Sequence, residues 1–147
     1  MSRIFLLIDD DEDDRSLFCE AIKEINLQFE CYSESNGRAA LTKLETNEFL
    51  RPDIIFLDIN MPVFNGWDVL ERLKSSEEFS DIPTIMYSTS GHEKDFEKAK
   101  RSGALTFFIK PYDYLQLKKI LNIITDHLEQ GTLSKIGHFI SINENVR

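Results

Sequence analysis

The chain has 147 residues, and its 26 acidic and 17 basic side chains give a formal net charge of -9 at pH 7. This length suits a single domain whose hydrophobic core is large enough to fold without disulfides or metal ions. The apolar content of 41% is too high for a disordered chain. The acidic balance argues against direct DNA binding, because duplex DNA is a polyanion, and against binding to an anionic membrane surface.

The sequence carries no segment typical of export or membrane insertion. The apolar run from Ile4 to Ile8 is far shorter than the roughly 20 residues that span a bilayer, and no small-residue cleavage site follows it. Cys19 and Cys31 show no metal-binding or redox spacing. We interpret them as two buried thiols in a reducing compartment, and we expect a cytoplasmic protein.

Short apolar runs and amphipathic stretches alternate along most of the chain. Continuous apolar runs predict buried strands at residues 4–8 and 54–57, and an alternating pattern predicts a strand at residues 28–33. Further strands are predicted at residues 84–87 and 105–109. Apolar residues at helical spacing predict helices around residues 17–25, 40–44, 67–73, 93–101 and 117–128. Five alternations of strand and helix favour a parallel α/β sheet with helices on both faces.

We expect one domain over residues 1–130, followed by a tail at residues 131–147 that is too short to be a separate output domain. Apolar residues recur in this tail, so it either docks on another surface or frays as a terminus. They include Ile136, Phe139, Ile140 and Ile142.

Chemically reactive residues follow the predicted strands. Asp9 and Asp10 follow the first strand, and Asp58 ends the third. Ser88 follows the fourth strand and Lys110 follows the fifth. Ligands bind beyond the carboxyl ends of the strands in open α/β sheets, so we expect these side chains to converge.

Converging carboxylates repel one another and need a countercharge, for which a divalent hard cation is suited. A small number of carboxylates favours Mg²⁺, with Mn²⁺ as an alternative. A metal and Lys110 beside Asp58 would also equip the site for phosphoryl transfer onto that carboxylate.

Four more acids follow Asp10, and we interpret them as features of a helix start. Asp11 suits the N-cap or the preceding loop. Glu12, Asp13 and Asp14 suit the first helical turn because negative charge there complements the helix dipole. We therefore do not expect these acids to be ligands.

From about Arg3 to Leu128, the sequence resembles a receiver domain of two-component response regulators. The matching features are the Asp9–Asp10 pair, the run from Asp53 to Pro62 with Gly66 after it, Ser88, and Lys110–Pro111. The resemblance implies a flavodoxin-like, doubly wound sheet of five parallel strands in the order 2-1-3-4-5, with five helices.

The resemblance also implies roles for single residues at the site. Asp58 corresponds to the phosphoacceptor. Asp10, Asp58 and the backbone carbonyl of Asn60 correspond to direct Mg²⁺ ligands, and Asp9 corresponds to an acid that acts through water. Lys110 corresponds to the lysine that contacts the phosphoryl group, and a cis peptide bond to Pro111 is an option there.

Two further positions correspond to a conformational switch. Ser88 occupies the position of the switch hydroxyl, and Phe107 that of the switch aromatic. Their movement would remodel the face formed by the fourth helix, the fifth strand and the fifth helix. Phe107 equally suits a plain core role. Asn60 and Ser90 stand where family members tune dephosphorylation, and we interpret Trp67 as a packing residue.

The implied function is that of a phosphoacceptor and not of an enzyme with a separate substrate. A sensor histidine kinase or a histidine phosphotransfer protein would supply the phosphoryl group to this stand-alone receiver, and the downstream protein is unknown. Docking would use the first helix near Leu17 and Phe18, although Phe18 also suits the core. The sequence does not decide whether the protein forms a homodimer. The alternative function is a receiver-fold binding module that works without phosphorylation.

Overall fold

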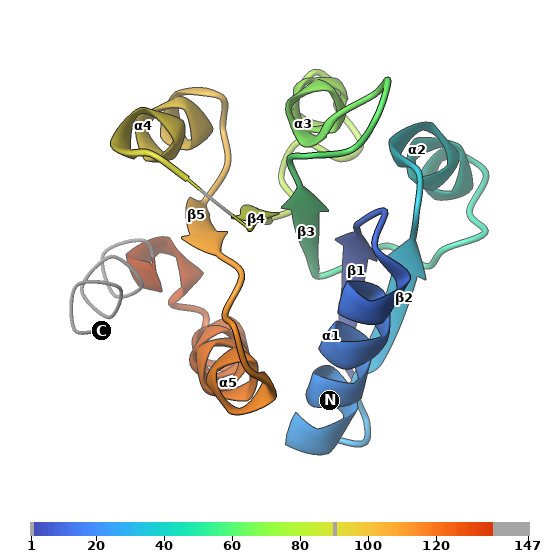
Figure 1. The fold of residues 1–147 in the computed structure, drawn as a ribbon. Helices are drawn as coiled ribbons and strands as arrows, with labels where there is room; N and C mark the ends of the chain where they lie inside the picture. Colours follow the sequence, from blue (N-terminus) through green and yellow to red (C-terminus); the bar gives the residue numbers. More distant parts are fainter. Residues whose placement is uncertain (1, 90, 137–147) are drawn as a thin grey trace.

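Five parallel strands form one sheet in the order β2-β1-β3-β4-β5 in the computed structural model, which describes residues 2–89 and 91–136 (Figure 1). The strands are β1 (Ile4–Ile8), β2 (Glu30–Glu34), β3 (Ile54–Asp58), β4 (Thr84–Ser88) and β5 (Thr106–Ile109). The helices are α1 (Glu12–Ile25), α2 (Gly37–Glu45), α3 (Gly66–Lys74), α4 (Glu93–Arg101) and α5 (Tyr114–Gln130), with a short 3-10 helix at Leu133–Lys135. The predicted fold class and strand order are confirmed.

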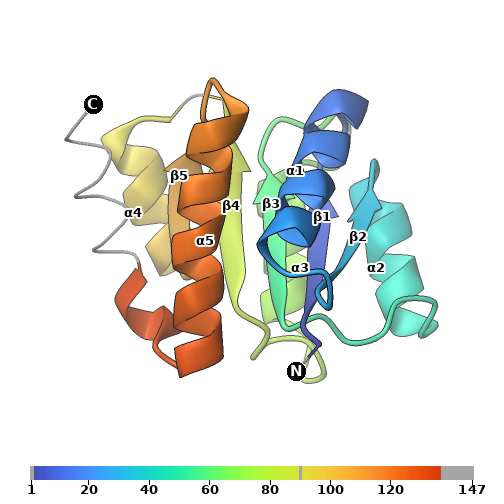
Figure 2. The same ribbon diagram turned by 90° about the horizontal axis from the view of Figure 1, so that it is seen from below.

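The helices cover both faces of the sheet. Figure 1 shows α1 and α5 on one face and α2, α3 and α4 on the other, and Figure 2 shows α1 and α5 side by side. Parallel strands need crossover connections, and here each crossover carries a helix back across the sheet. All five residues of β3 and of β4 are therefore buried, as their unbroken apolar runs predict.

Aromatic rings dominate the core beneath α1 and α5. The Phe18 ring lies 4.8 Å from the Phe56 ring, and the Tyr87 and Phe108 rings are 4.9 Å apart, centroid to centroid. Phe18 is fully buried, so its core interpretation is confirmed, whereas Leu17 beside it remains 42% exposed. Aliphatic side chains fill the other half of the core, under α2, α3 and α4, and include Leu6, Ile55, Leu57, Val69, Leu70 and Met86.

Caps at the helix starts fix how the chain leaves each strand. Asp11 is the N-cap of α1, and its carboxylate accepts the backbone N–H of Asp14, as the sequence predicts. Asn65 and Asp68 form a capping box at the start of α3. A Cβ at Gly66 would overlap the carbonyl oxygen of Asp58, so glycine there lets α3 begin directly against the end of β3.

The described part of the tail packs back onto the domain. Gly131, with a φ of 72°, ends α5 in the left-handed region that glycine adopts freely. Leu133 and the fully buried Ile136 then pack against the core under α1 and α5. The docking alternative is thus confirmed for residues up to 136, whereas Phe139, Ile140 and Ile142 lie outside the described residues.

The second strand begins and ends later than predicted. It covers Glu30–Glu34 and not residues 28–33. This strand is at the edge of the sheet and most of its residues are only half-buried, so apolar patterning defines its ends weakly. No helix within the described residues is long and apolar enough to cross a membrane.

The prediction of two buried thiols is wrong. Cys19 of α1 and Cys31 of β2 are joined by a disulfide, with their Cα atoms 5.4 Å apart, and both residues are half-buried. The crossover from α1 into β2 brings the two side chains together across the face of the sheet. A separation of 12 residues matches no redox motif, so only the tertiary packing reveals the pair.

Reducing the disulfide should destabilise the domain. A cross-link that closes a loop of this size lowers the entropy of the unfolded chain and contributes about 3 kcal/mol to the free energy of unfolding. We expect dithiothreitol to lower the free energy of unfolding of the wild type by that amount, seen as a lower urea midpoint, and Cys31→Ser to show the low midpoint without reductant. The double variant Cys19→Ser/Cys31→Ser is the control, and its urea midpoint should be the same with and without reductant. Equal midpoints for oxidised and reduced wild type would contradict the prediction.

Candidate functional site

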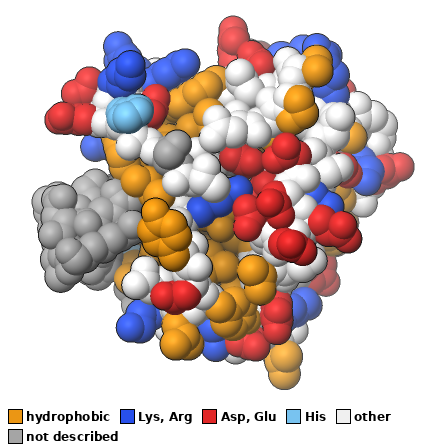
Figure 3. All heavy atoms as spheres, in the orientation of Figure 1, with side chains coloured by type: hydrophobic (Ala, Val, Ile, Leu, Met, Phe, Trp, Pro, Cys, Tyr) orange, Lys and Arg blue, Asp and Glu red, His pale blue; other side chains and the backbone are white. Residues whose placement is uncertain are grey.

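Three carboxylates meet at the carboxyl edge of the sheet. Strands β1 and β3 are neighbours with Ile8 opposite Leu57, so the residues that follow, Asp9 and Asp58, stand side by side. One carboxylate oxygen from each of Asp9, Asp10 and Asp58 lies within 4.8 Å of the others. Figure 3 shows acidic side chains gathered near the middle of this face, with basic atoms beside them. The predicted convergence is confirmed for these three acids.

Burial of two of these carboxylates makes it costly for all three to carry a negative charge. Asp9 is fully buried and Asp58 is 4% exposed, while Asp10 is exposed. Burial raises the pKa of Asp58 to about 7, and the charge of Asp9 adds to that rise, although the ammonium of Lys110 opposes it. Close carboxylate oxygens with too little positive charge fit a divalent hard cation, so these residues suit Mg²⁺ or Mn²⁺.

Lys110 brings a positive charge among the three acids at this edge, and the Arg15 guanidinium also reaches it by donating to the backbone carbonyl of Asp9 at 2.9 Å. Its Nζ lies 2.7 Å from Asp9 Oδ2, 2.8 Å from Asp14 Oδ2 and 3.7 Å from Asp58 Oδ2. The backbone N–H of Lys110 donates to the carbonyl of Ser88 at 2.6 Å, which ties the residue after β5 to the end of β4. The sequence correctly predicts that Lys110 meets the acids.

The Lys110 ammonium is itself almost buried. Burial acts to lower its pKa, but the hydrogen bonds to Asp14 and Asp9 and the charge of Asp58 outweigh that effect, so the pKa of Lys110 is raised. The ring of Tyr87 lies 5.0 Å from Nζ and adds a cation–π contact. Lys110 therefore stays charged in this setting.

Asp14 is a site residue that the sequence analysis missed. We expected it to be only a helix-start acid, yet its carboxylate reaches Lys110. The Cα–Cβ bonds of a helix tilt toward its N-terminus, so a side chain in the first turn of α1 projects back over the strand ends. That direction is a signal available from the sequence once α1 is known to begin at Glu12.

Asn60 links the acidic cluster to Ser88. Its backbone N–H donates to Asp58 Oδ1 at 3.1 Å, and its side-chain amide donates to Ser88 Oγ at 3.1 Å. Ser88 is 1% exposed at the end of β4. The predicted neighbourhood of these residues is confirmed, whereas metal binding by the Asn60 carbonyl stays a prediction. Ser90 lies outside the described residues.

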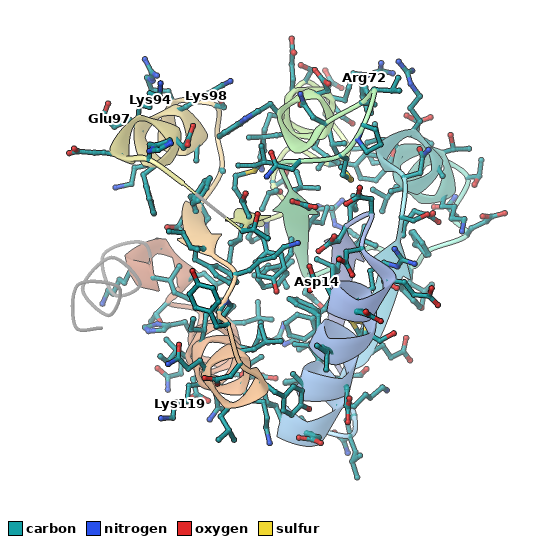
Figure 4. All side chains as sticks on the ribbon, viewed as in Figure 1. Asp14, Arg72, Lys94, Glu97, Lys98 and Lys119 are labelled. Atoms are coloured by element: carbon teal, nitrogen blue, oxygen red, sulfur yellow. A yellow bond between two sulfur atoms is a disulfide. The ribbon has the colours of Figure 1, made fainter. Side chains whose placement is uncertain are left out.

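Phe107 is a core residue in this structure. It is 1% exposed, and its ring lies 4.7 Å from that of Phe96 on α4. A Cβ at Gly91 would overlap the Phe107 ring, so the ring occupies space that only a glycine leaves open. Trp67 is half-buried and packs as expected, with Lys98 of α4 placed 4.4 Å from its ring (Figure 4).

The peptide bond between Lys110 and Pro111 is trans, so the cis form considered from the sequence is wrong. The peptide bonds of the described residues, including that between Lys110 and Pro111, are all trans. The trans form before proline is intrinsically favoured by about 0.5–1 kcal/mol, and the local packing does not reverse that preference.

The sheet order, the acidic edge and its lysine define an α/β domain of the receiver type. A sequence model of the response regulator receiver domain matches residues 5–122. The chain therefore belongs to this family, whose members act in two-component systems, and the resemblance noted from the sequence is confirmed.

Known relatives share much of the chain. The probable transcriptional regulator ycf29 of Pyropia yezoensis is 33% identical over 137 residues, a match covering 90% of this chain and 59% of that protein. Sporulation initiation phosphotransferase F of Bacillus subtilis strain 168 is 31% identical over 118 residues, covering 80% of this chain and 90% of that protein. The chain thus spans less than two thirds of the Pyropia protein.

Solved structures agree with the fold. The manganese-bound form of the response regulator Rcp1 superposes with a TM-score of 0.74 at 26% identity, covering 83% of this chain and 91% of that one. The phosphorylated cyanobacterial phytochrome response regulator RcpA gives a TM-score of 0.79 at 26% identity, covering 87% and 94%. One of these relatives holds a divalent metal and the other a phosphoryl group.

Removing the charge of Asp58 should stabilise the metal-free domain. The raised pKa means that the folded state holds this proton more tightly than the unfolded state, whose value is near 3.8. The associated stability is present below that value and is lost as the pH rises through about 7. In EDTA at pH 8, we expect Asp58→Asn to raise the free energy of unfolding by about 2–4 kcal/mol.

Urea unfolding at pH 4 and pH 8 checks this expectation. The advantage of Asp58→Asn should shrink toward pH 4, and added Mg²⁺ should stabilise the wild type more than the variant. Asp13→Asn, in the exposed first turn of α1, is the control for loss of a negative charge. A variant less stable than the wild type at pH 8 in EDTA would show that the charge of Asp58 does not destabilise the folded state.

Proposed function

We propose that Asp58 accepts a phosphoryl group from a phosphohistidine of a sensor histidine kinase or a histidine phosphotransfer protein. A carboxylate oxygen of Asp58 forms the new O–P bond while the N–P bond of the donor breaks, and that electron pair remains on the imidazole nitrogen. The observation that supports this most is a nearly buried carboxylate whose Oδ2 lies 3.7 Å from the Lys110 ammonium. The protein is then a phosphoacceptor and turns over no separate substrate.

We further propose Mg²⁺ as the resident cation, with Mn²⁺ as a substitute. Asp10, Asp58 and the backbone carbonyl of Asn60 would bind it directly, and Asp9 through water. A bound cation supplies positive charge that offsets the phosphoryl oxygens. The cluster of three carboxylates and the manganese-bound relative Rcp1 support this assignment.

The phosphoryl group would act on the surface through Ser88 and Phe107. The Ser88 hydroxyl would donate to a phosphoryl oxygen, which pulls the end of β4 and the following loop toward Asp58. That loop carries Gly91, against which the Phe107 ring packs, and the ring also contacts Phe96 of α4. A shift at Ser88 therefore reaches the α4–β5–α5 face, where a downstream protein would bind.

Donor docking would use the start of α1, where Leu17 is exposed. We place the protein in the cytoplasm because the phosphohistidine of a donor is made from ATP, although the Cys19–Cys31 disulfide is unusual for that reducing compartment. Phe18, fully buried, takes no part in this docking.

Incubation with acetyl phosphate and Mg²⁺ should add one phosphoryl increment to the intact mass of the protein. The increment should be absent in EDTA and in Asp58→Asn, because EDTA removes the cation and the substitution replaces the nucleophilic carboxylate with a neutral amide. Asp68→Asn, which changes an acid of the α3 capping box, is the matched control and should be phosphorylated normally. No increment on a folded wild type that binds Mg²⁺ would instead favour the phosphorylation-independent binding module.

Lys110→Ala should bind Mg²⁺ but lose the response of the α4–β5–α5 face. The chain has a single tryptophan, and Lys98 of α4 lies over the ring of Trp67, so the fluorescence of Trp67 reports movement of α4. We expect phosphorylated wild type to change its emission, and Lys110→Ala at an equal phosphorylated fraction to change little. Lys119→Ala, which changes an exposed lysine of α5, is the control. A full response in Lys110→Ala would contradict the role given to this lysine.

A further inference from the structure

We propose that Asp14 is a positioning residue that holds the Lys110 ammonium away from Asp58, and that it thereby limits how fast Asp58 is phosphorylated. The inference rests on the proposed function of Asp58. It adds an element that restrains the reaction before the phosphoryl group arrives.

Two of the three N–H groups of the Lys110 ammonium donate hydrogen bonds to acids other than Asp58. Lys110 Nζ donates to Asp9 Oδ2 at 2.7 Å and to Asp14 Oδ2 at 2.8 Å. Its distance of 3.7 Å to Asp58 Oδ2 is an ion-pair distance but exceeds that of a hydrogen bond. In this structure the lysine is therefore hydrogen-bonded to the two other acids, whereas its contact with Asp58 is an ion pair without a hydrogen bond.

Of the two acids that hold the lysine, Asp14 is the one able to release it. Asp9 is fully buried, and its other oxygen accepts the backbone N–H of Asp11 at 3.0 Å, so both of its oxygens are engaged. The Asp14 side chain is 32% exposed, in the first turn of α1. Figure 4 labels Asp14 beside α1, on the side of the helix that faces the sheet.

Asp14 also stands outside the group of acids that suits a metal. That group is Asp9, Asp10 and Asp58. A carboxylate that contacts the lysine without belonging to this cluster adds negative charge to the site, which opposes the approach of an anionic donor. Its contact with Lys110 must also weaken when the ammonium turns to the phosphoryl oxygens.

Both effects slow the reaction, so removing the carboxylate should speed it. We expect Asp14→Asn to raise the rate constant for phosphorylation by acetyl phosphate by about three- to tenfold, as suits a partly buried, charge-assisted contact. Asp14→Glu, which keeps the charge, should stay near the wild-type rate. The gain should shrink at high ionic strength, because Asp14 is partly exposed to solvent.

The matched control is Asp13→Asn. Asp13 is the neighbouring acid in the same turn of α1, and it is exposed. This variant removes the same charge from the adjacent position of the chain, so it measures the general electrostatic effect on an anionic donor. We expect its rate within about 1.5-fold of the wild type. Rates come from the time course of intact mass at saturating Mg²⁺.

A second readout separates positioning of the lysine from a structural effect on α1. Asp14→Asn should leave the Mg²⁺ dissociation constant, measured by calorimetry, equal to that of Asp13→Asn. In a Lys110→Ala background, Asp14→Asn should change the rate no more than Asp13→Asn does, because the contact that it removes is already gone.

The outcomes distinguish this inference from the proposed function. A wild type that takes no phosphoryl group on Asp58 overturns both. A normally phosphorylated wild type overturns this inference alone if Asp14→Asn matches Asp13→Asn, or if its gain persists without Lys110. A slower Asp14→Asn also overturns it, since Asp14 would then prepare the lysine instead of restraining it.

Discussion

The arrangement of the site depends on one ammonium group shared among buried carboxylates. Lys110 lies within 4.0 Å of three acids, and two of them, Asp9 and Asp58, are almost inaccessible to water. Without that cation their repulsion would oppose the pairing of β1 with β3, because the two carboxylates follow neighbouring strands. Even with it, the pKa of Asp58 stays high. The domain thus keeps a deficit of positive charge at the edge of the sheet where it is proposed to act.

Packing of the core holds the Asp9 and Asp58 carboxylates together despite their repulsion. The strands that deliver Asp9 and Asp58 are buried on both faces, and the aromatic rings beneath α1 and α5 interlock at centroid distances of 4.8 and 4.9 Å. Such packing holds the strand ends at fixed positions, so the carboxylates cannot separate to relieve their repulsion. The rigidity that creates the charge deficit also keeps the site ready for a cation, since its ligands need little rearrangement.

Sequence reasoning succeeded where the geometry of the sheet dictates the answer. Parallel strands bring their carboxyl ends to one edge, so Asp9, Asp58 and Lys110 could be placed together from the order of the strands alone. It failed where the answer depends on how elements pack. The contact of Asp14 with Lys110 depends on the direction of a side chain at the start of α1, and the Cys19–Cys31 bond on how α1 lies over β2. Spacing along the chain alone gives neither, although the direction of the Asp14 side chain follows once the start of α1 is known.

The disulfide also constrains how the site could change. It ties the middle of α1 to the edge strand, and α1 carries both Asp14 at its first turn and the exposed Leu17. A helix anchored in this way cannot slide along its axis when a phosphoryl group arrives. The proposed exchange of Lys110 between Asp14 and Asp58 would then need side-chain rotation but no sliding of α1. Movement on phosphorylation would be confined to the half of the sheet that contains β4, α4 and β5, and the surface offered to a donor at α1 would be the same before and after transfer.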